Sequence, residues 1–422
     1  MMLIFGAILL IITCTLYISY EKRLTPGLCL VGSWSFVCVT QGIFAADMYF
    51  SWFGGVIVLV FCSAFIVGEY FGLSGLQHVR INTLAELSAR DLILSQKFRK
   101  NLLIVVLIVG LYSLVAMVDY YQLLKGYSTG EEESIIISGV REVLAGDGIP
   151  LPMFIKVGIT MAYAGVILAL VYWILFGWRW FLILPIISVV LFGFSQSGRA
   201  GTIIILLQSF SAMYFRDLYN GKRNAAQRLG YRTMALLAVA FLIFVGGQIL
   251  REGGEGKVED VFRIFLHLRG YMFGGVSAFS HYVDYWMVDA QVSWGRYTFS
   301  SLYQALGLYA QETGIYDQYA PISQLGEVSN IYTAFRSLID DFHLIGGAIF
   351  CLLFGYGSGR LFSRSLHGDV QYFGPLIGVY SWAFFAPMAS LTYFNSFLVA
   401  MFFPWLYILY LLQGEGKRIV KL

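Results

Sequence analysis

Apolar stretches close to 20 residues long recur along the whole chain and constrain its fold more than any other feature. A helix of about 20 apolar residues can cross the hydrocarbon core of a bilayer. The sequence therefore predicts an all-α polytopic membrane protein with about eleven transmembrane helices, roughly ten to twelve. The stretches span approximately residues 2–20, 27–45, 53–73, 101–120, 153–176, 180–196, 201–216, 233–250, 344–362, 374–392 and 394–413.

The composition agrees with a membrane protein and excludes an ordinary soluble enzyme. Only 13% of the residues are charged and 58% are hydrophobic, whereas a soluble domain carries about 25% charged residues. A net charge of +3 leaves no basic surface for nucleic acid. The cysteines lie inside apolar stretches without the spacing of a zinc or redox site, so we expect no disulfide framework.

Lysine and arginine collect in alternate loops and set the expected orientation. Cytoplasmic loops are enriched in these residues, and placing the N-terminus outside and the C-terminus inside puts most of them in the cytoplasm. The first stretch lacks the flanks of a cleaved signal peptide, so we expect it to remain as a helix. Residues 1–422 then form a single integral membrane domain with two long outer loops, at 121–152 and 251–343.

The second outer loop contains an amphipathic segment at residues 257–272. Val258, Val261, Phe262, Phe265 and Met272 form an apolar stripe at helical spacing, and Arg269 falls in the middle of it. Such an arginine either snorkels to the lipid headgroups or turns inward to hold an anion. The planar guanidinium suits phosphate oxygens well.

Arg199 lies in a glycine-bounded turn between two apolar stretches. Gly198 and Gly201 permit a tight turn and the close approach of a ligand. Arg199 is either a membrane anchor or an anion ligand, and in the second case the N-terminus of the next helix would assist it.

Residues 330–346, NIYTAFRSLIDDFHLIG, combine a polar and an apolar helix face immediately before an apolar stretch. Arg336 and Asp340 are four residues apart and form either a solvated ion pair or part of a polar site. Asp341 and His343 stand where the chain enters the membrane, and either has the chemistry of a general base.

No apolar stretch carries an ionisable residue near its middle, which argues against ion-coupled transport. The chain has no Walker-type phosphate loop, HExxH, GxSxG or aspartate-rich magnesium cluster. We therefore expect chemistry without metal or cofactor, on a lipid-linked substrate at the outer face.

Three features together resemble the oligosaccharide repeat-unit polymerases, the O-antigen polymerase (Wzy) family. They are the many-helix layout with a large late outer loop, the turn Ser197-Gly198-Arg199-Ala200-Gly201, and the set Asn330, Tyr332, Thr333, Asp341, Phe342 and Gly346. His343 stands where a glycine often follows the Asp-Phe pair. The resemblance implies a GT-C-like glycosyltransferase of the bacterial inner membrane.

The resemblance also implies the reaction and its partners. The growing glycan would move from one undecaprenyl pyrophosphate to a hydroxyl of the next lipid-linked repeat unit, during synthesis of O-antigen lipopolysaccharide or a related polysaccharide. The donor, the acceptor, the lipid bilayer and a chain-length regulator are the expected partners.

For this reaction we expect guanidinium groups to stabilise the leaving pyrophosphate and a base to activate the acceptor hydroxyl. The pyrophosphate ligands are Arg199, Arg251 and Arg269, with Arg269 also catalytic. The base is Asp341, with His343, His281 and Glu252 as alternatives. Further substrate contacts come from Asn330, Tyr332, Thr333, Arg336, Asp340 and His281.

Three other functions fit parts of the sequence. An O-antigen ligase uses similar chemistry but delivers glycan to a lipid A core. A flippase or exporter of lipid-linked oligosaccharide would need a charged cavity at mid-membrane. A structural scaffold would leave the polar face of residues 330–341 without a role.

Overall fold

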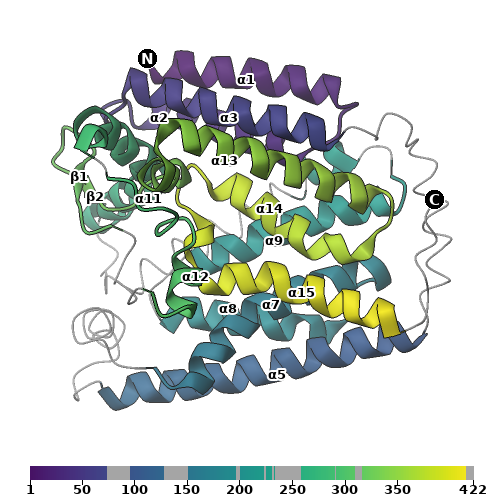
Figure 1. Ribbon diagram of the computed structural model, residues 1–422. Coiled ribbons are helices and arrows are strands. Elements are labelled where there is room, and N and C mark those ends of the chain that lie inside the picture. Colours follow the sequence, from purple (N-terminus) through teal and green to yellow (C-terminus); the bar gives the residue numbers. More distant parts are fainter. Residues whose placement is uncertain are drawn as a thin grey trace. The chain divides into compact units, whose positions relative to one another are not determined.

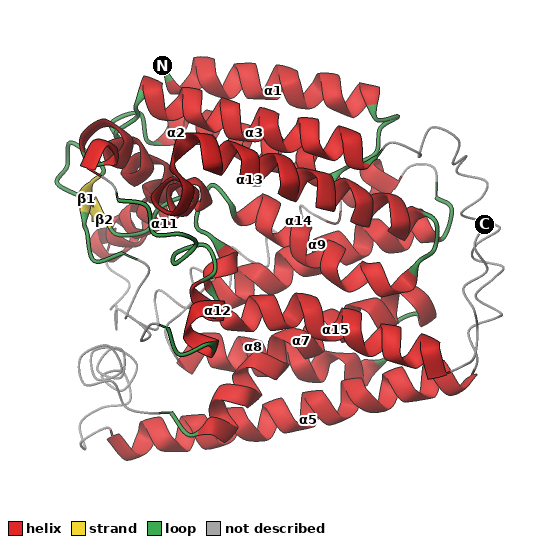
Figure 2. Ribbon diagram, viewed as in Figure 1, coloured by secondary structure: helices red, strands yellow, loops and turns green. Residues whose placement is uncertain are grey.

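The computed structural model describes residues 1–73, 96–127, 151–195, 200–222, 225–230, 232, 258–289, 291–308 and 316–414. In this part of the chain the regular structure is almost all helical (Figure 2). Two short strands, β1 (Ala320–Pro321) and β2 (Val328–Ser329), form an antiparallel pair with Ala320 opposite Ser329. The expected all-α architecture is therefore confirmed for these residues.

The helices follow one another along the chain as labelled in Figure 1. The α-helices are α1 (Met2–Ser19), α2 (Pro26–Phe44), α3 (Trp52–Gly72), α5 (Gln96–Tyr127), α7 (Met153–Phe176), α8 (Ile183–Ser195), α9 (Ala200–Tyr219), α11 (Val258–Tyr285), α12 (Ser300–Ala305), α13 (Ala334–Leu366), α14 (Phe373–Phe385) and α15 (Asn395–Gly414). Short 3-10 helices are η3 (Trp180–Leu182), η4 (Met287–Asp289), η5 (Val370–Tyr372) and η6 (Leu391–Tyr393).

Seven helices of the described chain are long and apolar enough to cross a membrane: α1, α2, α3, α5, α7, α13 and α15. The protein is thus a multi-pass membrane protein. Two expected stretches are shorter than a span, since α8 and α14 contain 13 residues each. The stretch 233–250 lies outside the described residues, and the total of about eleven spans stays a prediction.

The stretch expected at residues 374–392 ends as a helix at Phe385. Pro387 follows two residues later. Proline has no N–H to donate and disfavours helical backbone in the residue before it. The apolar composition alone did not reveal this helix end.

The chain folds into two compact units, each built from segments far apart in the sequence. Unit 1 contains Met1–His78, Phe262–Ser363 and Val379–Asn395, and unit 2 contains Val79–Val261, Arg364–Gly378 and Ser396–Leu422. The expectation of a single membrane domain stays a prediction. In unit 2, α7 is central and packs against α5, α8 and α9.

In unit 1, a buried carboxylate joins the C-terminal end of α3 to the N-terminus of α2. Glu69 accepts hydrogen bonds from Thr25 Oγ1 at 2.7 Å and from the Gly27 N–H at 2.8 Å. The first N–H groups of a helix lack intrahelical partners and carry partial positive charge. Glu69 therefore satisfies the start of α2, while Pro26 fits the first helical turn.

The contact between α3 and α13 depends on glycines spaced four residues apart. A Cβ added to Gly68 or Gly72 would overlap backbone oxygens of α13, and one added to Gly355 or Gly359 would overlap those of α3. Small residues at this spacing let two membrane helices approach through their backbones. Phe61 lies against Phe335, whereas Gly72 lies against Arg360, so the two helices run in the same direction.

We expect Gly355→Ala to destabilise unit 1, because the new Cβ must push α3 and α13 apart, at a cost of about 1–3 kcal/mol. The matched control is Gly357→Ala on the same helix, where an added Cβ meets no atom within 4 Å. The control should be neutral or gain about 0.5–1 kcal/mol from helix propensity. Thermal unfolding in detergent measures both variants, and equal melting temperatures would refute the glycine contact.

Candidate functional site

Helix α13 breaks at His343, which divides it into an amphipathic half and an apolar half. His343 has φ 56° and ψ −179°, a backbone conformation almost confined to glycine. The break coincides with the expected start of the apolar stretch at residue 344. The break also explains why residue 346 is a glycine, since an added Cβ there would lie 2.7 Å from the Cβ of Phe342.

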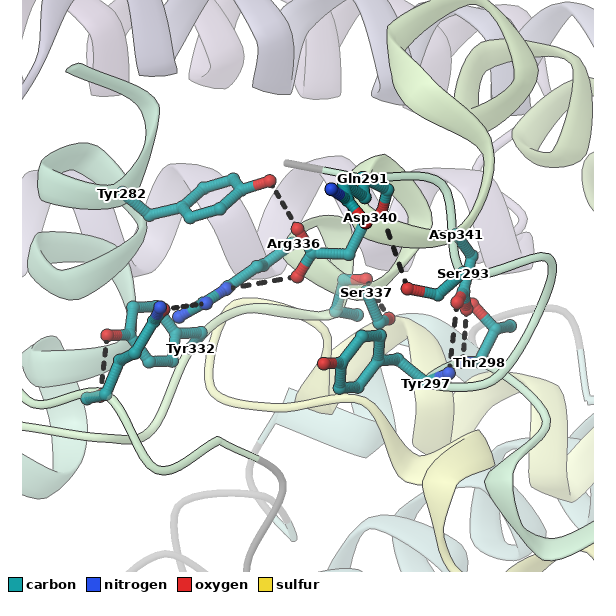
Figure 3. A network of polar contacts seen from close by, with 12 residues as sticks. Tyr282, Gln291, Ser293, Tyr297, Thr298, Tyr332, Arg336, Ser337, Asp340 and Asp341 are labelled. Carbon is teal, nitrogen blue, oxygen red and sulfur yellow. Dashed lines mark hydrogen bonds and ion pairs between the residues drawn. The ribbon is translucent and has the colours of Figure 1, made fainter. Parts of the chain in front are cut away.

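A break in a helix leaves carbonyl groups without their N–H partners, and a loop from earlier in the chain supplies them here. The N–H groups of Ser293 and Trp294 donate to the backbone carbonyls of Asp340 and Asp341 at 2.9 Å and 3.2 Å. The Asp341 carboxylate in turn accepts the N–H groups of Tyr297 at 3.0 Å and Thr298 at 2.5 Å (Figure 3). Asp341 is 0% exposed and fastens this loop to the break.

Arg336 is buried one turn before Asp340 and is enclosed by aromatic rings. Its guanidinium carbon lies 3.8 Å from the ring centroid of Tyr316, 3.9 Å from that of Tyr332 and 4.5 Å from that of Tyr282. A cation over aromatic faces is attracted by the ring quadrupole, more strongly when water is excluded. The side chain therefore has a fixed position and a fixed charge.

Two hydrogen bonds hold the Arg336 guanidinium, and one of its N–H donors has no acceptor in the described chain. Nε donates to Asp340 at 3.2 Å and Nη2 donates to Gln318 Oε1 at 2.5 Å. Nη1 is buried and has no acceptor among the described residues. A buried donor without an acceptor costs about 1–3 kcal/mol, so Nη1 is the donor of this side chain whose hydrogen bond the described residues leave unmade.

The tyrosines around Arg336 are held in their protonated form. Burial raises the pKa of Tyr282, and the negative charge of Asp340 raises it further. Burial likewise raises the pKa of Tyr316, again with Asp340 as the next cause. Tyr282 consequently serves as a hydrogen-bond donor, to Asp340 at 2.5 Å.

A band of aromatic rings connects Arg336 to His281. The Trp286 ring lies 5.9 Å from the Arg336 guanidinium carbon and 4.8 Å from the His281 ring, and Tyr285 lies 4.6 Å from His281. His281 Nδ1 is buried and has no partner among the described residues. Burial lowers the pKa of His281, opposed by the charge of Asp284, so the imidazole is neutral at pH 7.

Arg269 is buried, as expected if its side chain turns inward and does not extend to the lipid headgroups. Its partners are the carboxylates of Asp47 and Glu327. Nη1 and Nη2 donate to the two oxygens of Asp47 at 2.7 Å and 2.9 Å, and Nη2 also donates to Glu327. Burial lowers the pKa of Arg269, but the bonds and charges of Glu327 and Asp47 outweigh burial and raise it. The arginine is permanently charged, and the binding of pyrophosphate to it stays a prediction.

The structure brings together some of the expected site residues. Tyr332, Arg336, Asp340, Asp341 and His343 gather at the break in α13, where His343 is exposed. Thr333 is buried in the same turn, with an Oγ1 that lacks a partner in the described chain, and Asn330 is half-buried. Arg199, Arg251 and Glu252 lie outside the described residues.

Sequence reasoning missed several residues that complete these clusters: Tyr282, Tyr316, Gln318, Asp47 and Glu327. Asp47 is 222 residues from Arg269 in the chain, and Tyr282 is 58 residues from Asp340. No spacing rule connects such pairs. The one available signal was that Asp47 directly follows an apolar stretch, at the face of the membrane expected for the outer loops.

Comparison of the chain with known protein families, curated proteins and solved structures finds no match.

We expect Asp341→Ala to release the loop of residues 293–298, because the N–H groups of Tyr297 and Thr298 would lose their acceptor. Each buried N–H left unpaired costs about 1–3 kcal/mol. Hydrogen exchange of the peptides covering this loop should accelerate, while exchange in α7 stays unchanged. Asp317→Ala, at an exposed position, is the control, and unaltered exchange in Asp341→Ala would refute the fastening role.

We expect His343→Gly to raise the melting temperature, because glycine adopts the observed backbone angles without the strain of about 1–3 kcal/mol that other residues carry. His343→Val should lower it, since a β-branched residue is poorly accommodated at positive φ. A lower melting temperature for the glycine variant would show that the His343 side chain stabilises the break.

Proposed function

We propose that the protein is a glycosyltransferase that polymerises undecaprenyl-pyrophosphate-linked oligosaccharide repeat units at the outer face of the bacterial inner membrane. One observation carries this proposal: Arg336 is a buried, aromatic-enclosed cation, with one N–H that has no acceptor in the described chain, and it lies about two turns before the break from which the apolar half of α13 begins. The sequence motifs Asn330-x-Tyr332-Thr333 and Asp341-Phe342 surround it.

The leaving group explains why a fixed cation is needed. When the sugar leaves undecaprenyl pyrophosphate, negative charge develops on the diphosphate at the membrane surface. Preorganised donors in a water-excluded site stabilise such charge effectively. Arg336 has the planar donor geometry and the remaining Nη1 donor for a phosphate oxygen. The charge of Arg269 is already neutralised by Asp47 and Glu327, and Arg269, Arg199 and Arg251 remain proposed ligands.

The acceptor requires a ring-binding surface and a base. Tyr285 and Trp286 offer aromatic rings for sugar rings beside His281 and the Arg336 cluster, and Tyr297, which stacks on Tyr316 with one face, offers a third. Both oxygens of Asp341 accept backbone N–H groups, which limits its freedom as a base. His281, neutral and with a free Nδ1 among the described residues, has the chemistry to take the proton of an acceptor hydroxyl.

We expect Arg336→Lys to reduce polymer formation by about 100-fold or more, because lysine keeps the charge but loses the planar donors and the stacked position. Arg360→Lys, exposed on the other half of α13, is the matched control and should retain activity. The assay uses the purified protein in vesicles with lipid-linked repeat units as sole substrate, and product ladders are resolved by gel. Full activity of Arg336→Lys would overturn the proposed role of this cation.

The same assay tests the other proposed residues and the competing functions. We expect Arg199→Ala, Arg269→Ala and Asp341→Ala to abolish long-chain polymer in cells while membrane insertion remains normal. Full-length glycan from all three would refute these assignments. A ligase would give no ladder without its second acceptor, and a flippase would move lipid-linked sugar without lengthening it.

A further inference from the structure

We infer that residues 291–308 lie immersed in the lipid of the membrane face from which the apolar half of α13 begins. Lipid acyl chains are the partner that this surface fits. The inference concerns how the protein sits in its bilayer and is independent of the chemistry proposed above.

The composition of this segment differs from that of a water-exposed loop. The sequence QVSWGRYTFSSLYQALGL contains one charged residue, Arg296, among 18. Tryptophan, tyrosine and arginine are the residues that gather at the boundary between lipid headgroups and acyl chains. An arginine at this depth can extend its charge to the phosphates while its stem stays in lipid.

Four large apolar side chains of the segment are largely uncovered by protein. Trp294 is 76% exposed, Leu302 52%, Leu306 65% and Leu308 59%. An apolar patch of this kind facing water is unfavourable, and in a soluble protein it marks an interaction surface. In a membrane protein the bilayer itself provides the apolar partner.

The segment is fastened to α13 on both sides of the break. The Trp294 N–H donates to the carbonyl of Asp341, before the break. After the break, the Phe299 ring lies 5.9 Å from that of Phe350, which stacks at 5.8 Å on Phe342. The segment therefore follows α13 as that helix begins its apolar half.

The lipid-facing stripe of α13 continues from this attachment. Ile345, Ile349 and Leu353 recur every four residues and are 78%, 54% and 61% exposed. Because α13 is a candidate membrane span, lipid contacts this stripe. Exposed Trp294 is attached at Asp341, one helical turn before the stripe begins at Ile345, so its apolar surface is continuous with one that lipid already covers.

Backbone pairing makes shallow immersion possible. The N–H groups of Ser293, Trp294, Tyr297 and Thr298 all have acceptors in the protein. Tyr303 donates to the carbonyl of Trp294 at 2.5 Å, and the N–H groups of Phe299 and Leu302 are also paired. Irregular backbone tolerates an apolar environment only when its polar groups are satisfied in this way.

Spin labels test the immersion in the full-length protein reconstituted in nanodiscs of phosphatidylethanolamine and phosphatidylglycerol. Labels are attached to Leu302→Cys and Leu306→Cys in a Cys14→Ser background, because Cys14 is the exposed cysteine of the described chain. Leu353→Cys is the lipid control and Asp317→Cys, at an exposed loop position, is the water control. Collision rates with molecular oxygen and with a water-soluble nickel chelate are compared.

We expect the ratio of oxygen to chelate collisions at residues 302 and 306 to exceed that at residue 317 several-fold and to approach that at residue 353. A ratio at both positions equal to that at residue 317 would overturn the inference. A dipolar coupling between labels on two copies would also overturn it, by making a second chain the partner. If Leu302→Cys fails to fold, Leu306→Cys decides alone. The glycan ladder assay is a separate measurement, so failure here leaves the polymerase proposal to be judged on its own.

Discussion

The break in α13 at His343 is the constraint on which the proposed site depends. A continuous helix would satisfy the carbonyls of Asp340 and Asp341 internally and would leave no place for the N–H groups of Ser293 and Trp294. With the helix broken, the loop of residues 293–298 joins α13 through those carbonyls and through the Asp341 carboxylate. The strained backbone of His343 is thus coupled to the hydrogen bonds that hold the loop.

Close packing of α3 against α13 gives this arrangement a firm support. The glycine pairs bring the two backbones into contact, and the order of the contacts along both helices shows that they run in the same direction, so both begin at the same end of unit 1. The residues that precede α3 lie beside α11. There Tyr49 and Ser51 donate to Asp284 at 2.7 Å and 2.6 Å, while Asp47 pairs with Arg269.

Charge at this end of unit 1 is arranged in two distinct ways. Arg269 is neutralised by two carboxylates and joins the loop after α2 to the turn between β1 and β2. Arg336 has one carboxylate partner, three close tyrosine rings and a donor left over. Each arginine keeps one buried N–H without an acceptor in the described chain, Nε of Arg269 and Nη1 of Arg336, so the difference lies in the carboxylates: a buried arginine already neutralised by two of them is a structural tie, whereas one with a single carboxylate is better suited to an anionic ligand. This contrast is why the proposed function rests on Arg336.

The sequence by itself determined the class of the protein and the position of its most informative segment. Apolar length decides which helices can span a bilayer, and the change from amphipathic to apolar pattern placed the boundary at residue 344, next to the observed break. These are local properties, because each depends on residues within a few turns of one helix. They also identified Arg336, Asp340 and Asp341 as residues of interest.

Only the tertiary structure decided what those residues contact. The Tyr282, Tyr316 and Gln318 partners of the Arg336 cluster come from other elements, and Asp47 reaches Arg269 across 222 residues of chain. Helical periodicity shows which face a residue lies on but not which distant segment covers that face. The partners of a buried charge are set by long-range packing, and so the role of each arginine became visible only in the folded chain.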